Sequence, residues 1–239
     1  MGGKNYDEWA GRDSIFRNKL SNLRSGAPQS GQPVLAHRAG TSASEQYLQN
    51  LSADKVATPP ARAATAMPTS IEDMERMALF DSVTGLFNWR YFNRTLAYEL
   101  RRGERYRRPL AITLIAVDGL QTVRSQAGHD PADFILKSVV SSIETCIRDA
   151  DIAARHTDSS FAVLFPETNA AGLTTVAERI RQQVRAQQVM YAMQNFVITV
   201  SIGGASFPAH AKTPEDLLAR ANQSLQMAIE RGGDKVCVV

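Results

Sequence analysis

Helical and strand patterns alternate along the chain from about residue 70 to its end, and this alternation limits the folds that the chain can adopt. The apolar run LAITLIAV, residues 110–117, follows Pro109 and has the composition of a buried strand. Strand signals near residues 152–155 and 161–165 flank a short turn, which predicts a hairpin. The pattern predicts an α/β (α+β) fold in which a central mixed sheet is flanked by helices.

The other elements are predicted from helical spacing, capping residues and prolines. Ser70, followed by acidic residues, indicates the start of a helix that runs to about Phe80. Further helices are expected over residues 88–106, 131–149, 170–187 and 214–231, and further strands over residues 196–207 and 235–239.

Residues 1–69 differ in composition from the rest and are predicted to form a flexible N-terminal tail. Residues 25–68 are rich in Ala, Ser, Thr, Pro, Gly and Gln and nearly lack aromatic residues, so burial cannot offset the entropy lost on ordering. Residues 5–24 place four large apolar side chains at helical spacing, which indicates a docking segment, with nonspecific residual structure as the alternative. The prediction is a tail followed by one domain over residues 70–239.

Composition excludes several classes of protein. The 239 residues have a formal net charge of +3 and contain no Lys/Arg block long enough to indicate binding to duplex nucleic acid. No apolar run approaches the roughly 20 residues that cross a bilayer, and the first residues lack the apolar core of a secretory signal, so we expect a cytoplasmic protein without a membrane span. Cys146 and Cys237 have neither metal-ligand nor disulfide spacing, and reduced thiols are expected.

Several motifs occur in an order that resembles the GGDEF family, the diguanylate cyclase domain of bacterial signalling. DSVTGLFNWRYF, residues 81–92, resembles the family's D-x-L-T-G-L-x-N-R-R motif, and GHDPAD, residues 128–133, resembles its G-H-x-x-G-D. FAVLFPET, AERIR and TVSIGGA match the segments that follow the family's signature turn. The resemblance covers about residues 72–239 and implies the nucleotidyl-cyclase-like fold of a bacterial signalling domain.

The family joins two GTP molecules into cyclic di-GMP and needs metal ions held by carboxylates. The resemblance places the signature Gly-Gly-Asp/Glu-Glu-Phe on TDSSF, so Ser159 stands where a metal-binding acid is expected. Because a hydroxyl or methyl group cannot replace a carboxylate on a hard divalent cation, no catalytic residue, no bound metal and no required cofactor are predicted. The resemblance gives the degenerate active-site positions as Ala116, Arg124, Thr157, Asp158, Ser159 and Ser160. Ala116 stands where the family has a metal-binding Asp, and Arg124 where it has a guanine-reading Asn. Ile229 and Gly233 stand in place of the phosphate-binding Lys and Arg.

Two acidic residues remain near these positions. Asp133 is the one guanine or metal contact of the family that this chain keeps, and its alternative role is to cap or solvate the start of a helix. Asp118 lies two residues after Ala116 and therefore on the same face of a strand. A metal site rebuilt from Asp118 and Asp158 is thus an alternative to complete loss of the metal.

Many cyclases of the family also carry an inhibitory R-x-x-D site five residues before the signature turn, where cyclic di-GMP binds. Arg148 and Asp151 stand at this offset, and the resemblance assigns both to cyclic di-GMP. Arg179 matches a family position on the following helix, and Arg102, with Arg101 as the alternative, matches a position contributed by a neighbouring domain. An arginine fork can bind phosphate or guanine, and a carboxylate can accept from guanine N1 and N2. A solvated surface pair is the alternative for the R-x-x-D residues.

Three functions remain open at this point. The leading hypothesis is a non-catalytic cyclic di-GMP receptor that signals to a protein partner through the tail, or through a homodimer or ligand-linked dimer. The second is a scaffold that binds protein partners without nucleotide. The third is a residual GTP-binding or cyclase enzyme, which the composition of the signature turn disfavours.

Overall fold

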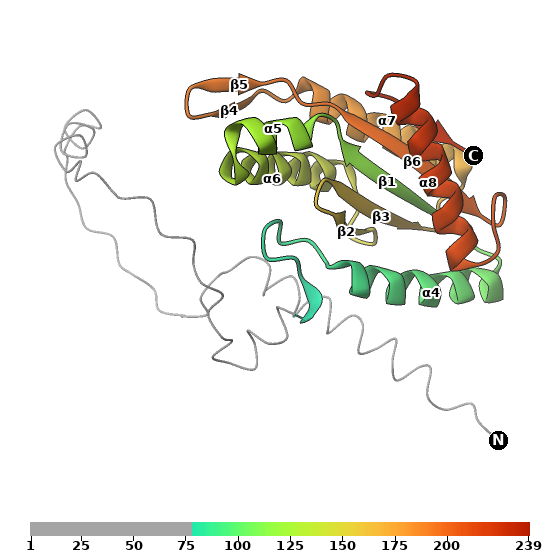
Figure 1. Ribbon diagram of the computed structural model, residues 1–239. Coiled ribbons are helices and arrows are strands. Elements are labelled where there is room, and N and C mark those ends of the chain that lie inside the picture. The colour runs from blue at the N-terminus through green and yellow to red at the C-terminus, as the bar shows by residue number, and fades with distance from the viewer. Residues whose placement is uncertain (1–77) are drawn as a thin grey trace, which may run out of the picture. The chain divides into compact units, whose positions relative to one another are not determined.

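The computed structural model describes residues 78–239 (Figure 1). The predicted tail over residues 1–69, its docking segment over residues 5–24 and most of the helix predicted to end at Phe80 lie outside the described residues. Residues 78 and 79 are helical. None of the helices within residues 78–239 is long and apolar enough to cross a membrane.

A mixed five-stranded sheet forms the centre of the described domain, with strand order β2-β3-β1-β6-β7. The middle strand β1 (Leu110–Val117) pairs antiparallel with β3 (Ser160–Pro166) and β6 (Val200–Phe207). At the edges, β2 (Ile152–Thr157) pairs antiparallel with β3, and β7 (Val236–Val238) pairs parallel with β6. The predicted fold class is confirmed.

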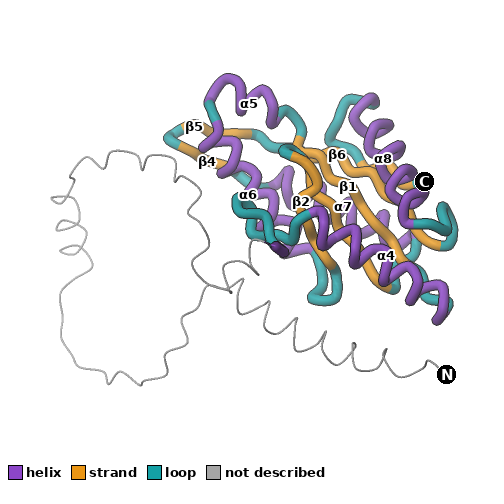
Figure 2. The backbone as a smooth tube through the Cα atoms, turned by 60° about the horizontal axis from the view of Figure 1, so that its bottom comes forward, coloured by secondary structure: helices purple, strands orange, loops and turns teal. Residues whose placement is uncertain are grey.

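Helices cover both faces of this sheet (Figures 1 and 2). Helices α4 (Trp89–Tyr106) and α8 (Pro214–Glu230) contribute to one apolar core. Helices α6 (His129–Cys146) and α7 (Ala170–Ala186) contribute to the other, and the short α5 (Leu120–Ala127) packs beside α6. The two-sided burial explains why β1 is apolar on both faces, apart from the buried Thr113, rather than alternating.

Side chains of β1 alternate between the two cores. Ile112 and Leu114 pack toward α4 and α8, whereas Ala111 and Ile115 pack toward α6 and α7. Because period-two alternation fixes the register of the strand, it also fixes which residues lie at its end, where the candidate site begins.

Capping residues determine where two of the helices begin. The Asn88 side chain accepts a hydrogen bond from the Tyr91 N–H and starts α4, and the Thr213 side chain accepts one from the Asp216 N–H at the start of α8. Pro214 occupies the first turn of α8, where its missing N–H costs no hydrogen bond.

The structure differs from the predicted elements in three places. Helix α5 was not predicted, since only Leu120 of its eight residues is buried and the apolar pattern is weak. The strand predicted over residues 196–207 is divided, because β5 (Gln194–Phe196) pairs with β4 (Val189–Tyr191) in a separate hairpin. Helix α6 begins two residues before Pro131 and ends at Cys146, since proline is tolerated in a first helical turn.

Strand β6 and helix α8 approach each other closely at Gly203. A Cβ atom at this position would overlap the carbonyl oxygen of Ala221 and the backbone nitrogen of Leu225. Both contacts are with backbone, so no side chain can turn aside to make room. The absence of a side chain at Gly203 therefore sets the distance between the sheet and α8.

Gly203→Ala is expected to lower the free energy of unfolding by about 3 kcal/mol, because α8 must move away from the sheet. Gly172→Ala is the matched control in α7, where the new Cβ would meet the flexible side chain of Thr168 at 3.1 Å. The control is expected to change stability by less than about 1 kcal/mol. Urea denaturation followed by circular dichroism measures both variants, and equal stabilities would contradict the close approach.

Candidate functional site

The degenerate active-site positions come together where β1 ends beside the turn between β2 and β3. Ala116 is the register partner of Ser160 across β1 and β3. The backbone N–H of Val117 donates to the carbonyl oxygen of Ser159 at 2.9 Å. The structure thus places residues far apart in sequence at one end of the sheet.

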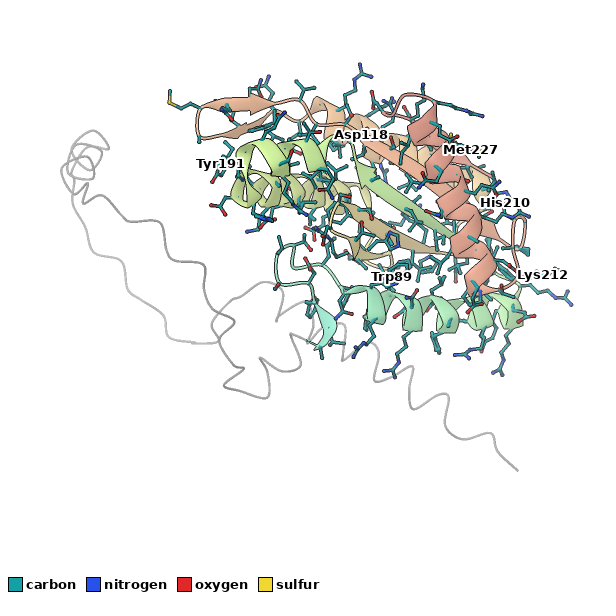
Figure 3. The ribbon with its side chains drawn as sticks, in the orientation of Figure 1. Trp89, Asp118, Tyr191, His210, Lys212 and Met227 are labelled. Carbon is teal, nitrogen blue, oxygen red and sulfur yellow. The ribbon has the colours of Figure 1, made fainter. Side chains whose placement is uncertain are left out.

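Hydroxyl groups fill the place of the signature acids and bond to one another. The Ser160 hydroxyl lies 2.6 Å from the Thr157 hydroxyl and 3.1 Å from Nδ1 of His156. The His156 ring contacts Trp89, with 4.4 Å between the ring centroids, and Figure 3 labels Trp89 at this position. Burial lowers the pKa of His156, so its ring is mainly neutral at pH 7. The Thr157, Ser160 and His156 side chains therefore bring no negative charge that would attract a metal cation.

The Asp118 carboxylate, by contrast, is engaged by three donors within the fold. It accepts hydrogen bonds from the hydroxyls of Thr199 at 2.8 Å and Ser201 at 2.7 Å, and from the backbone N–H of Asp234 at 3.1 Å. These bonds connect the end of β1 to β6 and to the loop between α8 and β7. Asp118 lies at this junction in Figure 3.

A rebuilt metal site gains no support from these contacts. Asp118 has three protein donors, and the Asp158 carboxylate lies 3.7 Å from the guanidinium of Arg124. Among residues 78–239 no group of three or more His, Cys, Asp or Glu side chains could hold a metal ion.

Two arginines hold the signature turn from different elements. Arg124 extends from α5 and donates to the carbonyl oxygen of Asp158 at 3.3 Å. Arg155, on β2, donates to the carbonyl oxygens of Thr157 and Asp158. Burial lowers the pKa of Arg155, while the charges of Asp158 and the partly buried Asp133 are among those that favour its protonated form. The motif comparison identified Arg124 but missed Arg155, whose one sequence signal is its place just before the turn.

The loop between α8 and β7 is held by ion pairs. The Asp234 carboxylate lies 2.5 Å from Arg181 and 2.8 Å from Arg185, and Arg181 also pairs with Glu178 at 2.6 Å. This loop includes Gly233, where the resemblance expects a phosphate-binding Arg. Ile229, in the place of the phosphate-binding Lys, is 41% exposed and carries no charge.

The R-x-x-D residues form a closed turn between α6 and β2. The Arg148 backbone N–H donates to Oδ2 of Asp151 at 2.8 Å, and the Asp151 N–H donates to the Arg148 carbonyl oxygen at 2.9 Å. The Arg148 side chain is exposed and forms no ion pair or hydrogen bond with another residue of the described range. Its guanidinium is therefore available to a ligand.

Arg179 lies at the same turn. Its guanidinium reaches from α7 to donate to the carbonyl oxygen of Cys146, the last residue of α6. Burial raises the pKa of Asp151, whereas the Arg148 N–H and the charges of Arg148 and Arg179 act to lower it. The structure thus gathers three of the four residues predicted to bind cyclic di-GMP.

Arg102 is not joined to these three residues. It lies on α4 and forms an ion pair with Glu99 at 3.1 Å, with about half of its side-chain surface exposed. Within residues 78–239 no hydrogen bond or ion pair connects it to the R-x-x-D turn.

Comparison with known proteins assigns the domain. The family described as "Diguanylate cyclase, GGDEF domain" matches residues 78–235. The chain belongs to the GGDEF family. It therefore carries a domain of cyclic di-GMP signalling, and its described part is that GGDEF domain.

Two curated relatives show how much of the chain is shared. The GGDEF chain is 30% identical over 139 residues to diguanylate cyclase A of Treponema denticola, which covers 58% of this chain and 38% of that protein. It is 30% identical over 162 residues to the response regulator PleD of Caulobacter vibrioides, which covers 67% and 36%. The match thus spans less than half of the length of these relatives.

A solved structure supports the fold of the GGDEF domain. The coiled coil and GGDEF domain of DgcB from Caulobacter crescentus, in complex with c-di-GMP, superposes with a TM-score of 0.66 at 24% identity. The superposition covers 70% of this chain and 89% of that chain. At this level of identity the likeness concerns the fold alone.

Asp118→Asn is expected to lower the free energy of unfolding of the GGDEF domain by about 1–3 kcal/mol, because an amide cannot accept all three hydrogen bonds that the carboxylate accepts. Asp149→Asn is the matched control at an exposed position and is expected to be neutral. Thermal unfolding of both variants measures the difference. An unchanged Asp118 variant would show that the three hydrogen bonds contribute little.

Proposed function

We propose that this GGDEF domain is a non-catalytic receptor that binds cyclic di-GMP at the R-x-x-D turn and passes the bound state to a protein partner. The observation that supports this proposal most is the gathering of Arg148, Asp151 and Arg179 at one turn. The acids required for catalysis are replaced at the same time by Ala116 and by serines.

The groups at the R-x-x-D turn match the chemistry of the ligand. The exposed guanidinium of Arg148 can donate two parallel hydrogen bonds to a phosphate or to O6 and N7 of guanine. Oδ2 of Asp151 accepts from Arg148, whereas Oδ1 accepts from no described residue and can receive guanine N1–H or N2–H. Arg179 adds a second positive charge, which favours a dinucleotide with two phosphates.

The former catalytic turn lacks the groups that phosphoryl transfer needs. Metal ions supply most of the charge stabilisation in that chemistry, and they bind to carboxylates. Here Ser159 and Ser160 are neutral, and Arg124 extends across the turn to Asp158 from the position of the guanine-reading Asn. GTP would meet an arginine where the family provides an amide, and it would meet no metal-binding pair of acids.

Arg102 is proposed to act from a second domain. Its partly exposed guanidinium lies on α4 and forms no contact with the R-x-x-D residues of its own described domain. It can therefore complete the ligand site of a neighbouring domain. A dimer linked by cyclic di-GMP would use it in this way. The partner that receives the signal is proposed to bind through the N-terminal tail.

Arg148→Ala is expected to weaken cyclic di-GMP binding about ten- to a hundredfold, since the fork is lost and guanine or phosphate acceptors stay unpaired. Isothermal titration calorimetry of the full chain measures the affinity. Arg220→Ala is the matched control, because this exposed arginine on α8 takes no part in the turn. Loss of affinity in both variants, or in neither, would refute the assignment of Arg148. Absence of binding by the unaltered chain would favour the nucleotide-independent scaffold.

Ser159→Asp is expected not to restore synthesis of cyclic di-GMP. The single new carboxylate still lacks the acid at Ala116 and the phosphate-binding side chains at Ile229 and Gly233. Chromatography of reactions with GTP and magnesium detects the product. Formation of cyclic di-GMP by this variant would show that one carboxylate is enough and that the remaining site is intact.

A further inference from the structure

Exposed apolar side chains gather at the β4–β5 hairpin. Six large apolar residues are exposed within residues 78–239, and four of them lie on or next to this hairpin. They are Phe134 (40% exposed), Met190 (61%), Met193 (97%) and Val197 (84%). The hairpin extends beyond α5 and α6 at one end of the domain (Figure 1), with Tyr191 labelled there in Figure 3.

The turn of the hairpin holds its residues in a backbone conformation that disfavours them. Ala192 has φ 47° and Met193 has φ 65°, both in the left-handed region. Hairpin turns of this kind prefer Asn and Gly, and a residue with a Cβ costs roughly 1–2 kcal/mol there. Because Met193 is almost fully exposed, its side chain adds nothing to the core of its own domain. Folding therefore does not explain why an apolar side chain occupies this position.

The hairpin also lacks the charges that normally protect exposed strands. No Asp, Glu, Lys or Arg occurs between Arg185 and Lys212. Strands β4 and β5 pair with each other in a separate two-stranded sheet, so each has one edge without a partner strand in the described domain. An uncharged strand edge with apolar neighbours is a template for pairing with another strand.

We propose that this hairpin is a homodimer interface, in which β5 of one chain pairs antiparallel with β5 of a second copy and the two copies bury Met193 and Val197 between them. A two-fold axis would place Asn195 opposite Asn195, so that the exposed backbone groups of identical strands satisfy one another. The hairpin surface does not include the R-x-x-D turn, so the proposed dimer does not depend on ligand binding.

Charge favours a second copy as the occupant. In a two-fold interface the same patch meets itself, so any charged patch faces its own sign. The hairpin avoids this repulsion because it carries no charged residue, although the whole chain has a net charge of +3. Its inner side is already fixed to the domain through the buried Val189 and through the contact of Tyr191 with Phe134, whose ring centroids are 5.4 Å apart. The outer edge is thus presented on a rigid support.

The test is sedimentation of the full chain without nucleotide over about 1–200 µM, since an interface this small is expected to have a dissociation constant in the micromolar range. Met193→Gly is expected to raise the midpoint of thermal unfolding, because glycine accepts the left-handed conformation, and to weaken the dimer at least about tenfold. If Met193 had only a structural role, Met193→Gly would not both raise the midpoint of thermal unfolding and weaken the dimer.

Val197→Lys is expected to abolish the dimer, because residue 197 lies opposite Met193 of the second copy and a charged side chain would be buried against it. Tyr106→Lys is the matched control, since Tyr106 is 59% exposed at the end of α4, which lies at the other end of the domain from the hairpin (Figures 1 and 2). Hydrogen exchange of the unaltered chain should show protection of the Asn195 amide at high concentration, because this residue is paired across the axis. A chain that stays monomeric, or a dimer that Met193→Gly and Val197→Lys leave unchanged, overturns the proposal.

Discussion

The three hydrogen bonds accepted by Asp118 hold together the end of the sheet beside the turn between β2 and β3. They join the residue that directly follows β1 to two hydroxyl groups in or next to β6 and to the loop after α8. The same loop is tied to α7 through Asp234 and its two arginines. A carboxylate that would otherwise need a counterion is thereby satisfied by neutral donors, and it serves as a structural junction.

The domain separates two electrostatic environments that share one sheet. At the signature turn Ser159 and Ser160 carry no charge, and the guanidinium of Arg124 lies 3.7 Å from the Asp158 carboxylate. At the R-x-x-D turn Arg148 and Arg179 lie near the carboxylate of Asp151. The proposed receptor function is consistent with this separation, because no hydrogen bond or ion pair within residues 78–239 joins the two turns.

Much of the fold could be predicted because its strongest signals are local. The run LAITLIAV and the capping residue Asn88 mark β1 and α4 without any knowledge of distant contacts. The break between β5 and β6 could not be predicted, since FVITV reads as one apolar strand although Val197 is 84% exposed. Motif spacing placed Ala116 and Ser159 together. It could not reveal that Asp118 is bonded to hydroxyls more than 80 residues away, because such contacts leave no periodic pattern.

Helix α6 is a stiff rod of 18 residues, about 27 Å long at 1.5 Å per residue. Its C-terminal residue Cys146 accepts the bond from Arg179 beside the R-x-x-D turn, and its first turns carry Phe134 against the hairpin residue Tyr191. A small tilt of a helix of this length at one end displaces its other end. The R-x-x-D turn and the hairpin thus contact opposite ends of one helix, and any energetic coupling between them would be equal in both directions.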